Sequence, residues 1–216
     1  MDEAIRTILE QRLIAVIRLD DVDRDILPIA QALQAGGVRV LEITLTSGSA
    51  PAALERLCAW TRTTAGQDVT VGVGSVRHAE EARAAVDAGA SFIVSPGLVP
   101  GILEQRAALG APIIPGILTP SEAMAAHELG ADAIKLFPAS LGGPTYLKNL
   151  LAPLPDLELI PTGGITLDAI PAYLAAGAAA VGLGSALIPP ETIARRNWDE
   201  LRQRAHQAVH QAHGQT

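Results

Sequence analysis

Two charged residues lie in segments that otherwise consist of apolar residues. Lys135 stands in AIKLF and Glu42 stands in VLEIT, and both segments have the composition of buried strands. Because a low dielectric disfavours the charged form of an amine, a buried lysine can become a neutral nucleophile. Such an amine condenses with a ketone or aldehyde to a Schiff base, and a nearby carboxyl group can transfer the protons that this reaction needs. The pair predicts Schiff-base chemistry, with a structural ion pair as the alternative.

Three further candidates stand where other apolar segments end. Arg18 follows AVI, Ser75 follows VGVG and Pro96 follows IVS. In a barrel of parallel strands these carboxyl ends meet at the face that carries active sites. Outside such a barrel, Arg18 fits a surface ion pair equally well, and Ser75 fits a turn hydroxyl better.

The last two apolar segments lead into glycine-containing loops, PTGGIT and GLGSAL. Gly163 and Gly164 allow backbone N–H groups to approach an anion closely, and Ser185 can add a hydroxyl donor. Barrels often bind phosphate with the loops after strands seven and eight, where a helix N-terminus also favours negative charge. The two loops together predict a phosphate-binding end, whereas one Gly-Gly pair alone indicates only a turn.

No metal site and no cofactor are predicted. His206, His210 and His213 lie in a C-terminal segment that is typical of a solvated helix, and the other two histidines, His78 and His127, lie in other helical segments. Because no cluster of His, Asp and Glu accompanies them, a metal-dependent mechanism is disfavoured.

Short apolar runs alternate with longer segments of helical periodicity, which is typical of parallel α/β proteins. The predicted strands cover residues 13–18, 38–45, 69–74, 91–96, 112–117, 132–137, 157–164 and 179–185. Eight such units predict a (β/α)₈ TIM barrel, a single domain over residues 1–216 with a short N-terminal helix. A doubly wound open sheet is the rival fold. It is disfavoured because the first strand does not lead into a G-x-G-x-x-G loop.

Composition excludes several classes of protein. The 216 residues are 49% hydrophobic and 18% charged, with a net charge of −7 and no dense run of Lys and Arg. A nucleic-acid groove is disfavoured because it requires clustered positive charge, and no apolar run is long enough for a membrane helix. The first residues, MDEAIRTILEQR, lack the apolar core of a secretory signal. Cys58, the single cysteine, is expected to be a buried hydrophobe; one thiol forms no disulfide within the chain, which fits a cytoplasmic protein. An anionic small molecule remains possible as a partner, because a few local donors can hold it.

Taken together, these motifs resemble one family, the bacterial 2-keto-3-deoxy-6-phosphogluconate and 2-keto-3-deoxy-6-phosphogalactonate aldolases. They occur in the family's order over nearly the whole chain and read AVIR, AGGVRVLEITL, VGVGSV, FIVSPG, IPGILTPSE, IKLFPAS, PTGGI and GLGSAL. The resemblance implies a metal-independent class I aldolase on a (β/α)₈ barrel, usually a homotrimer. It implies cleavage of a six-carbon 2-keto-3-deoxy acid phosphate into pyruvate and glyceraldehyde 3-phosphate.

The resemblance also implies roles for single residues. The Schiff-base lysine falls on Lys135, and the acid/base glutamate, which works partly through a water, falls on Glu42. Arg18 matches an arginine near the pyruvyl carboxylate and the phosphate, and Ser75 matches a hydroxyl residue that is usually Thr. The positions that match the pocket wall and the phosphate end are Pro96, Phe137, Thr162, Gly163, Gly164, Gly184 and Ser185.

Departures from the family pattern leave the substrate open. Thr46 stands in LTS where gluconate-type members carry a substrate-facing Arg, and GGPTYLKNL resembles the galactonate type, whereas PTGGI resembles the gluconate type. The preferred stereochemistry at C4 is therefore open, as is 4-hydroxy-2-oxoglutarate as a main substrate. Two other interpretations remain: a barrel phosphosugar isomerase or synthase, and a barrel that binds phosphosugars without turnover.

Overall fold

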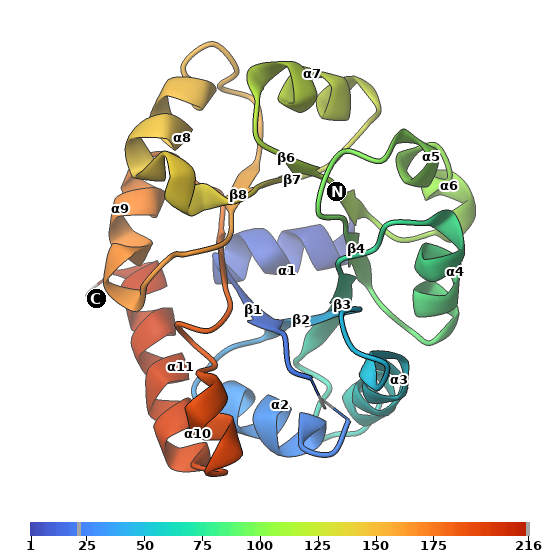
Figure 1. Ribbon diagram of the computed structural model, residues 1–216, viewed down its shortest axis with the longest axis vertical. Coiled ribbons are helices and arrows are strands. Elements are labelled where there is room, and N and C mark those ends of the chain that lie inside the picture. Colours follow the sequence, from blue (N-terminus) through green and yellow to red (C-terminus); the bar gives the residue numbers. More distant parts are fainter. Residues whose placement is uncertain (21–22, 215–216) are drawn as a thin grey trace.

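Helices surround a group of parallel strands in the computed structural model, which describes residues 1–20 and 23–214 (Figure 1). The strands are β1 (Leu13–Ile17), β2 (Val40–Thr44), β3 (Thr70–Gly74), β4 (Phe92–Val94), β5 (Ile113–Ile114), β6 (Gly116–Ile117), β7 (Ile134–Leu136), β8 (Leu159–Pro161) and β9 (Val181–Leu183). The helices are α1 (Glu3–Gln11), α2 (Ile26–Ala35), α3 (Ala50–Thr61), α4 (Ala79–Asp87), α5 (Pro100–Leu103), α6 (Arg106–Leu109), α7 (Pro120–Glu128), α8 (Gly143–Leu151), α9 (Ile170–Ala175), α10 (Pro190–Ala194) and α11 (Trp198–His213), with 3₁₀ turns η1 (Ala139–Leu141) and η2 (Leu167–Ala169). Within the described ranges, no helix has both the length and the apolar character needed to cross a bilayer.

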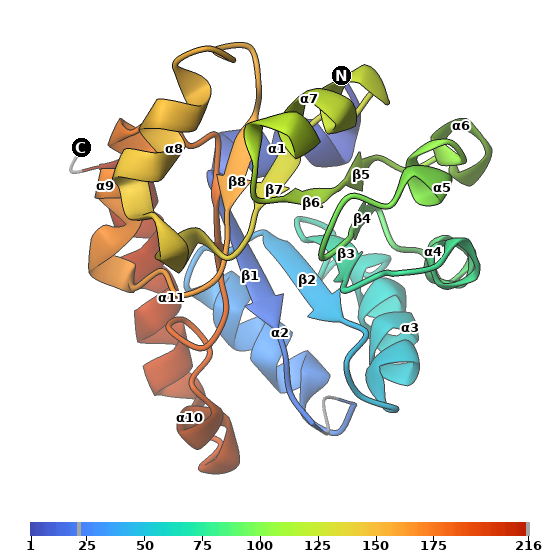
Figure 2. The same ribbon diagram turned by 45° about the horizontal axis from the view of Figure 1, so that its top comes forward.

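The strands form two parallel sheets. The larger has the order β5-β4-β3-β2-β1-β9, and the smaller has the order β6-β7-β8. A single bridge between Thr162 and Gly182 connects the end of β8 with β9. The larger sheet curls, with α2 and α3 on its outer side (Figure 2). The predicted parallel α/β architecture, in which strands alternate with helices along the chain, is confirmed.

The fifth predicted strand, residues 112–117, is divided at Pro115. The ladder between β4 and β5 ends with the bond from the Ser95 N–H to the Ile114 carbonyl (3.2 Å), and the next residue is a proline, which has no N–H to add to a ladder. The carbonyl of Pro115 accepts instead from the N–H of Lys135 (2.8 Å). The chain therefore passes from the larger sheet to the smaller one at this residue, which the sequence analysis did not predict.

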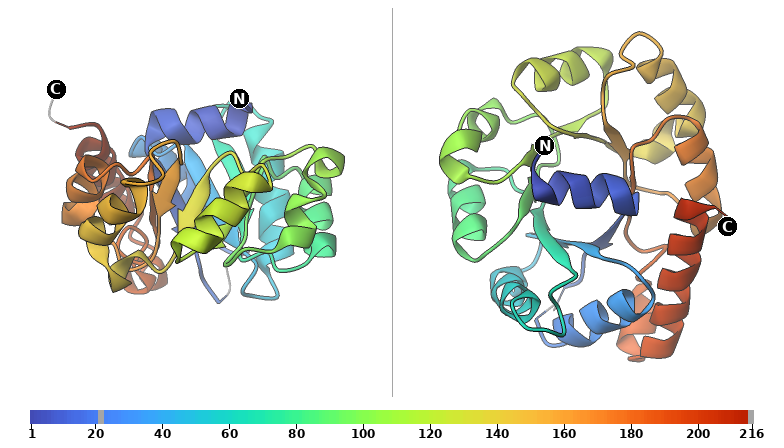
Figure 3. Two further views of the ribbon diagram at one scale, coloured as in Figure 1. Left: turned by 90° about the horizontal axis from the view of Figure 1, so that it is seen from above. Right: turned by 180° about the vertical axis from the view of Figure 1, so that it is seen from behind.

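Two apolar clusters lie on the two sides of the strands. The outer cluster fills the space between the strands and the surrounding helices. The inner cluster lies inside the curl, where α1 crosses one end of the strands and contributes Ala4, Ile5 and Ile8 (Figure 3). Its strand members are Ile14, Val16, Val40, Phe92, Val94, Ile114, Ala133, Ile160 and Ala180. Because side chains alternate along a strand, Glu42 shares the inner face with Val40, and Lys135 shares it with Ala133.

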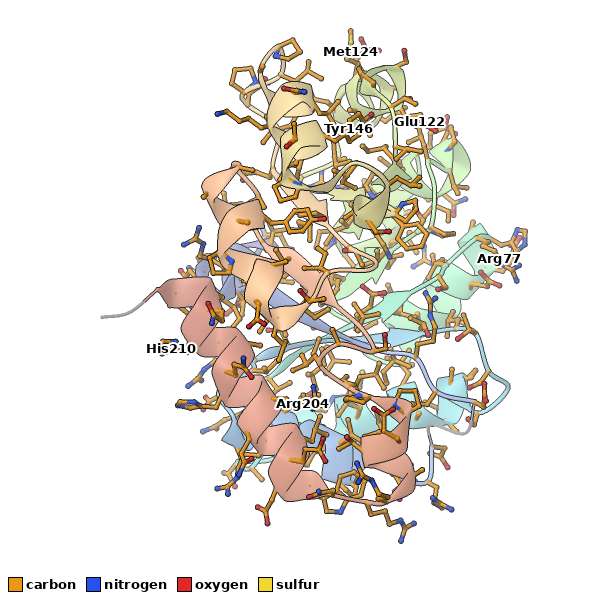
Figure 4. All side chains as sticks on the ribbon, turned by 60° about the vertical axis from the view of Figure 1, so that its left-hand side comes forward. Arg77, Glu122, Met124, Tyr146, Arg204 and His210 are labelled. Carbon is orange, nitrogen blue, oxygen red and sulfur yellow. The ribbon has the colours of Figure 1, made fainter. Side chains whose placement is uncertain are left out.

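Helix α7 begins with a reciprocal cap built on Glu122. The carboxylate of Glu122 accepts from the N–H groups of Leu118 (2.9 Å) and Thr119 (2.8 Å) and from the Thr119 hydroxyl (2.7 Å). These bonds hold the pKa of Glu122 below its usual value of 4.5, and the bond from the Leu118 N–H has the largest effect. Tyr146 of α8, seen near Glu122 in Figure 4, donates to the carbonyl of Leu118. The cap therefore fixes the link between β6 and α7.

We expect Glu122→Gln to lower the free energy of unfolding by about 1 kcal/mol at neutral pH. Because the folded pKa lies below the unfolded one, the carboxylate stabilises the fold fully above the unfolded value, and this contribution is lost as pH falls through the folded value. Denaturant unfolding at about pH 7 and about pH 3 measures the effect. The difference between wild type and variant should shrink at low pH, and Glu128→Gln, at an exposed position of the same helix, is the control. A difference that does not change with pH would contradict this assignment.

Candidate active site

Lys135 and Glu42 meet on the inner face of the strands, next to the inner cluster. Lys135 lies in the middle of β7, and Glu42 lies in the middle of β2. Their side chains are 5% and 3% exposed, and Nζ of Lys135 lies 4.0 Å from Oε1 of Glu42. This separation exceeds that of a direct hydrogen bond. The structure thus brings a buried amine and a buried carboxylate together without a direct hydrogen bond between them.

Phe137 lies two residues after Lys135 and faces the same way. Nζ of Lys135 lies 5.2 Å from the centre of the Phe137 ring, within range of a cation–π attraction. The ring also approaches Gly163, where an added Cβ atom would lie 2.8 Å from it. Phe137 therefore lies between the lysine and the loop that follows β8.

A cavity of about 580 Å³ opens beside Lys135 and Phe137. It lies at the carboxyl ends of β1, β7, β8 and β9, whereas α1 crosses the opposite ends of the strands. Six further predicted residues line it, and they are Arg18, Thr162, Gly163, Gly164, Gly184 and Ser185. A cavity of this size holds a small organic molecule.

Glu42, Ser75 and Pro96 are not among the residues that line this cavity. Glu42 lies beside Lys135, Ser75 follows β3 with a left-handed φ of 64°, and Pro96 is exposed after β4. All three stand on the strands or strand ends where the sequence places them. The cavity itself is formed mainly by the loops after β8 and β9, so the structure separates Ser75 and Pro96 from its lining.

The loops after β8 and β9 can present donors to an anion. Gly163 and Gly164 have φ values of 93° and 76°, a left-handed conformation that glycine adopts without steric cost. This conformation is also the reason why the predicted strand 157–164 ends at Pro161. The guanidinium of exposed Arg18 and the hydroxyl of Ser185 add further donors. Such a set of groups suits a phosphate or a carboxylate.

Several lining residues were missed by the sequence analysis. They are Val16, Ile165, Thr166, Ala186, Ile188 and Pro190. Ile165, Thr166 and Ala186 lie within the loops PTGGIT and GLGSAL, which the sequence pointed to without marking these three residues. Ile188 and Pro190 have no signal beyond their apolar character. Gly74, which precedes Ser75, was missed as well, although its alternation with Gly72 in VGVG is unusual for a strand.

Other reactive groups lie away from the cavity. Cys58 is a buried residue of α3 in the outer cluster, and burial raises the pKa of its thiol to about 11. Among the residues that the structure describes, no three side chains of His, Cys, Asp or Glu lie close enough together to hold a metal ion. Cys58 is therefore a packing residue of the fold.

The high pKa of Cys58 has a measurable result. We expect the native thiol to react with a disulfide reagent at about pH 8 at least about 100-fold more slowly than the thiol of the unfolded chain, because a pKa of about 11 in place of 9.0 lowers the thiolate fraction by that factor. Reaction rates with and without denaturant measure this difference. Equal rates in both states would show that the thiol is accessible and ionised in the native protein.

Comparisons with known proteins agree on one family. The model of the family described as KDPG and KHG aldolase matches residues 4–204. A 2-dehydro-3-deoxy-phosphogluconate aldolase of Haemophilus influenzae is 38% identical over 200 residues, which cover 92% of this chain and 92% of the relative. A protein of the same name from Pseudomonas aeruginosa is 35% identical over 201 residues, which cover 93% and 89%. The crystal structure of KDPG aldolase from Legionella pneumophila, with pyruvate captured at low pH as a covalent carbinolamine intermediate, has a TM-score of 0.86 and 33% identity, and covers 94% of this chain and 97% of that one.

Proposed function

Because the chain belongs to the KDPG and KHG aldolase family, we propose that it cleaves a 2-keto-3-deoxy-6-phospho sugar acid, of the gluconate or galactonate type, to pyruvate and glyceraldehyde 3-phosphate. It is a class I aldolase, a carbon–carbon lyase that works through a lysine Schiff base. The observation that carries the assignment of the site is the buried pair of Lys135 and Glu42, with 4.0 Å between Nζ and Oε1. A phosphosugar isomerase or synthase, the alternative from the sequence, does not require that pair.

Lys135 supplies the nucleophile. Its amine adds to the C2 ketone to give a carbinolamine, which loses water to give an iminium ion. When the C3–C4 bond breaks, its electron pair moves toward the iminium, so that an enamine stays on the lysine and the C4 fragment leaves as the aldehyde. Protonation of the enamine at C3 and addition of water then release pyruvate and restore the amine. The carbinolamine captured in the Legionella pneumophila enzyme supports the first of these steps.

Glu42 transfers the protons. Its carboxylate takes the proton of the C4 hydroxyl as the C3–C4 bond breaks, and the resulting carboxylic acid returns a proton to C3 of the enamine. Because Oε1 lies 4.0 Å from Nζ, atoms bonded to Nζ come within reach of the carboxylate directly or through one water. The same proton serves both half-reactions, so the carboxylate is restored at the end of the cycle.

The other candidates hold the substrate. We assign Arg18 to its carboxylate and phosphate, and Ser75 to a hydroxyl contact near the pyruvyl group. We also assign Pro96 and Phe137 to the pocket wall, and of these two Phe137 lines the cavity. The phosphate end consists of Thr162, Gly163, Gly164, Gly184 and Ser185. The support for this assignment is the shared cavity that contains Arg18, Phe137 and the loops after β8 and β9.

Substrate preference depends partly on Thr46. Its hydroxyl lies 3.0 Å from that of Thr44, which in turn lies 3.3 Å from the carbonyl of Ile17. This short side chain is therefore held at the end of β2, where it cannot extend as an arginine would. Cleavage assays with the gluconate and galactonate epimers and with 4-hydroxy-2-oxoglutarate would rank the three substrates.

The proposal extends to architecture and assembly. We propose one (β/α)₈ barrel, a single domain over residues 1–216, in which both sheets take part. The bridge between Thr162 and Gly182 joins β8 to β9, and Pro115 alone separates β5 from β6. The homotrimer and the cytoplasmic location stay predictions, which sedimentation and cell fractionation would test.

Trapping with borohydride tests the proposed function. After incubation with pyruvate and sodium borohydride, peptide mass spectrometry should find a reduced pyruvyl adduct on the peptide that contains Lys135. The only other lysine of the sequence is Lys148, which is exposed and serves as an internal control. Folded protein without an adduct would make Lys135 a structural ion and would favour the isomerase interpretation.

A further inference from the structure

Strand β3 carries glycine at two successive positions of its inner face. Gly72 pairs with Glu42, and Gly74 pairs with Thr44, in the parallel ladder between β2 and β3. Neither glycine has the positive φ that would itself favour glycine. Glycine weakens a strand and often marks a close approach by another group. The limited space on the inner face of β3, rather than a backbone conformation that favours glycine, therefore explains why both positions are glycine.

Side chains from the two neighbouring strands occupy this space. A Cβ atom added at Gly72 would lie 2.3 Å from the Phe92 ring of β4. A Cβ atom added at Gly74 would lie 1.8 Å from Oε1 and 2.5 Å from the carboxyl carbon of Glu42. Real Cβ atoms essentially never approach another heavy atom within 3.0 Å. The carboxylate of Glu42 thus packs directly against the backbone of Gly74.

Packing, rather than hydrogen bonding, fixes this carboxylate oxygen. Oε1 of Glu42 is buried and has no hydrogen-bond partner among the described residues. Its ion pair with Lys135 spans 4.0 Å, which is too long to define a direction. No directional bond therefore holds Oε1 in place against a group added at position 74.

We infer that Gly74 is a positioning residue, which sets the place of the Glu42 carboxylate relative to Nζ of Lys135 by having no side chain. The inference rests on the proposed function, in which that carboxylate transfers the protons. With alanine at position 74, Oε1 would have to lie at least 3.4 Å from the new methyl group to reach ordinary van der Waals contact. A misplacement of about 1 Å in a reacting group can lower the rate by about 10²-fold.

Gly74→Ala tests the inference with two readouts on pyruvate. Borohydride trapping at Lys135 reports the amine, and exchange of the methyl protons of pyruvate for deuterium reports proton transfer by the carboxylate. We expect trapping close to that of wild type and exchange lowered by about 10²-fold. Exchange at the wild-type rate would overturn the inference and leave the proposed function standing. A wild-type protein that forms no adduct would overturn the proposed function itself.

Two control substitutions separate positioning from stability. Gly72→Ala adds the same methyl group on the same face, but against Phe92, so it should lower stability without lowering the ratio of exchange to trapping. Glu42→Ala removes the carboxylate, so the further change Gly74→Ala should alter exchange by less than about twofold.

The double variant also provides a test of the inference if the Gly74→Ala protein does not fold. Without the carboxylate the overlap is gone, so Glu42→Ala with Gly74→Ala should fold as Glu42→Ala does. If Glu42→Ala folded and the double variant did not, Gly74 would serve the backbone alone, and the inference would be overturned.

Discussion

Replacing Lys135 with methionine should lower kcat by about 10⁴-fold or more and abolish the pyruvyl adduct, since removal of a catalytic nucleophile has effects of this order. Methionine keeps the length and the apolar stem of the side chain but has no amine, so neither the carbinolamine nor the iminium can form. Release of pyruvate from a phosphorylated 2-keto-3-deoxy acid, followed with a coupled enzyme, measures the loss.

Stability must be measured beside activity in this variant. Without Nζ, the buried Glu42 loses its ion pair, so we expect the free energy of unfolding to fall by roughly 3 kcal/mol. Adding Glu42→Gln should restore part of this loss without restoring turnover. Lys148→Met, on the exposed side of α8, is the matched control and should behave as wild type. Normal turnover by Lys135→Met would contradict the assignment of the Schiff base to this residue.

Replacing Glu42 with glutamine should lower kcat by about 10²- to 10⁴-fold, the usual contribution of a general acid/base. Glutamine keeps the shape that fits between Lys135 and Gly74 but cannot take up the proton of the C4 hydroxyl. Deuterium exchange into pyruvate should fall together with turnover, whereas borohydride trapping at Lys135 should remain. Coupled detection of pyruvate, deuterium exchange into pyruvate and borohydride trapping, applied to the purified Glu42→Gln protein, measure the three quantities.

Glu55→Gln is the control for this second substitution, because it makes the same chemical change at an exposed position of α3. It should leave turnover, exchange and trapping unchanged. If Glu42→Gln lost trapping in parallel with turnover, the carboxylate would act in forming the Schiff base rather than in the proton transfers that follow it. Wild-type turnover would make the carboxylate a structural partner of the lysine.

Sequence patterns were informative wherever the signal was local. Lys135 and Glu42 stand out because their neighbours are apolar, and a charge in a buried strand has few structural explanations. The alternation of strands and helices predicted the parallel α/β architecture, and the glycines of PTGGI and GLGSA marked the loops that line the cavity. The alternation extends along the chain, but each of its elements, like each of the other signals, is contained within about ten residues.

The features that sequence reasoning missed depend on contacts between distant segments. Pro115 divides a predicted strand: it follows the last bond of the ladder with β4, its nitrogen has no hydrogen to donate, and its carbonyl accepts from the N–H of Lys135 in β7. Gly74 makes room for a side chain that lies more than thirty positions earlier in the chain. Ser75 and Pro96 do stand at strand ends, but the cavity is lined mainly by the loops after β8 and β9. No local sequence pattern shows which of these distant segments come into contact.

The place of β1 in the larger sheet has a consequence during protein synthesis. One edge of β1 pairs with β2, but the other pairs with β9, where Leu13 lies opposite Val181. At a translation rate of roughly 5–20 residues per second, the ribosome needs roughly 8–33 s after β1 to deliver β9. Throughout this interval the nascent chain carries an open strand edge in LIAVI, which is the kind of edge that chaperones shield. The first strand to be made is thus among the last to be completed.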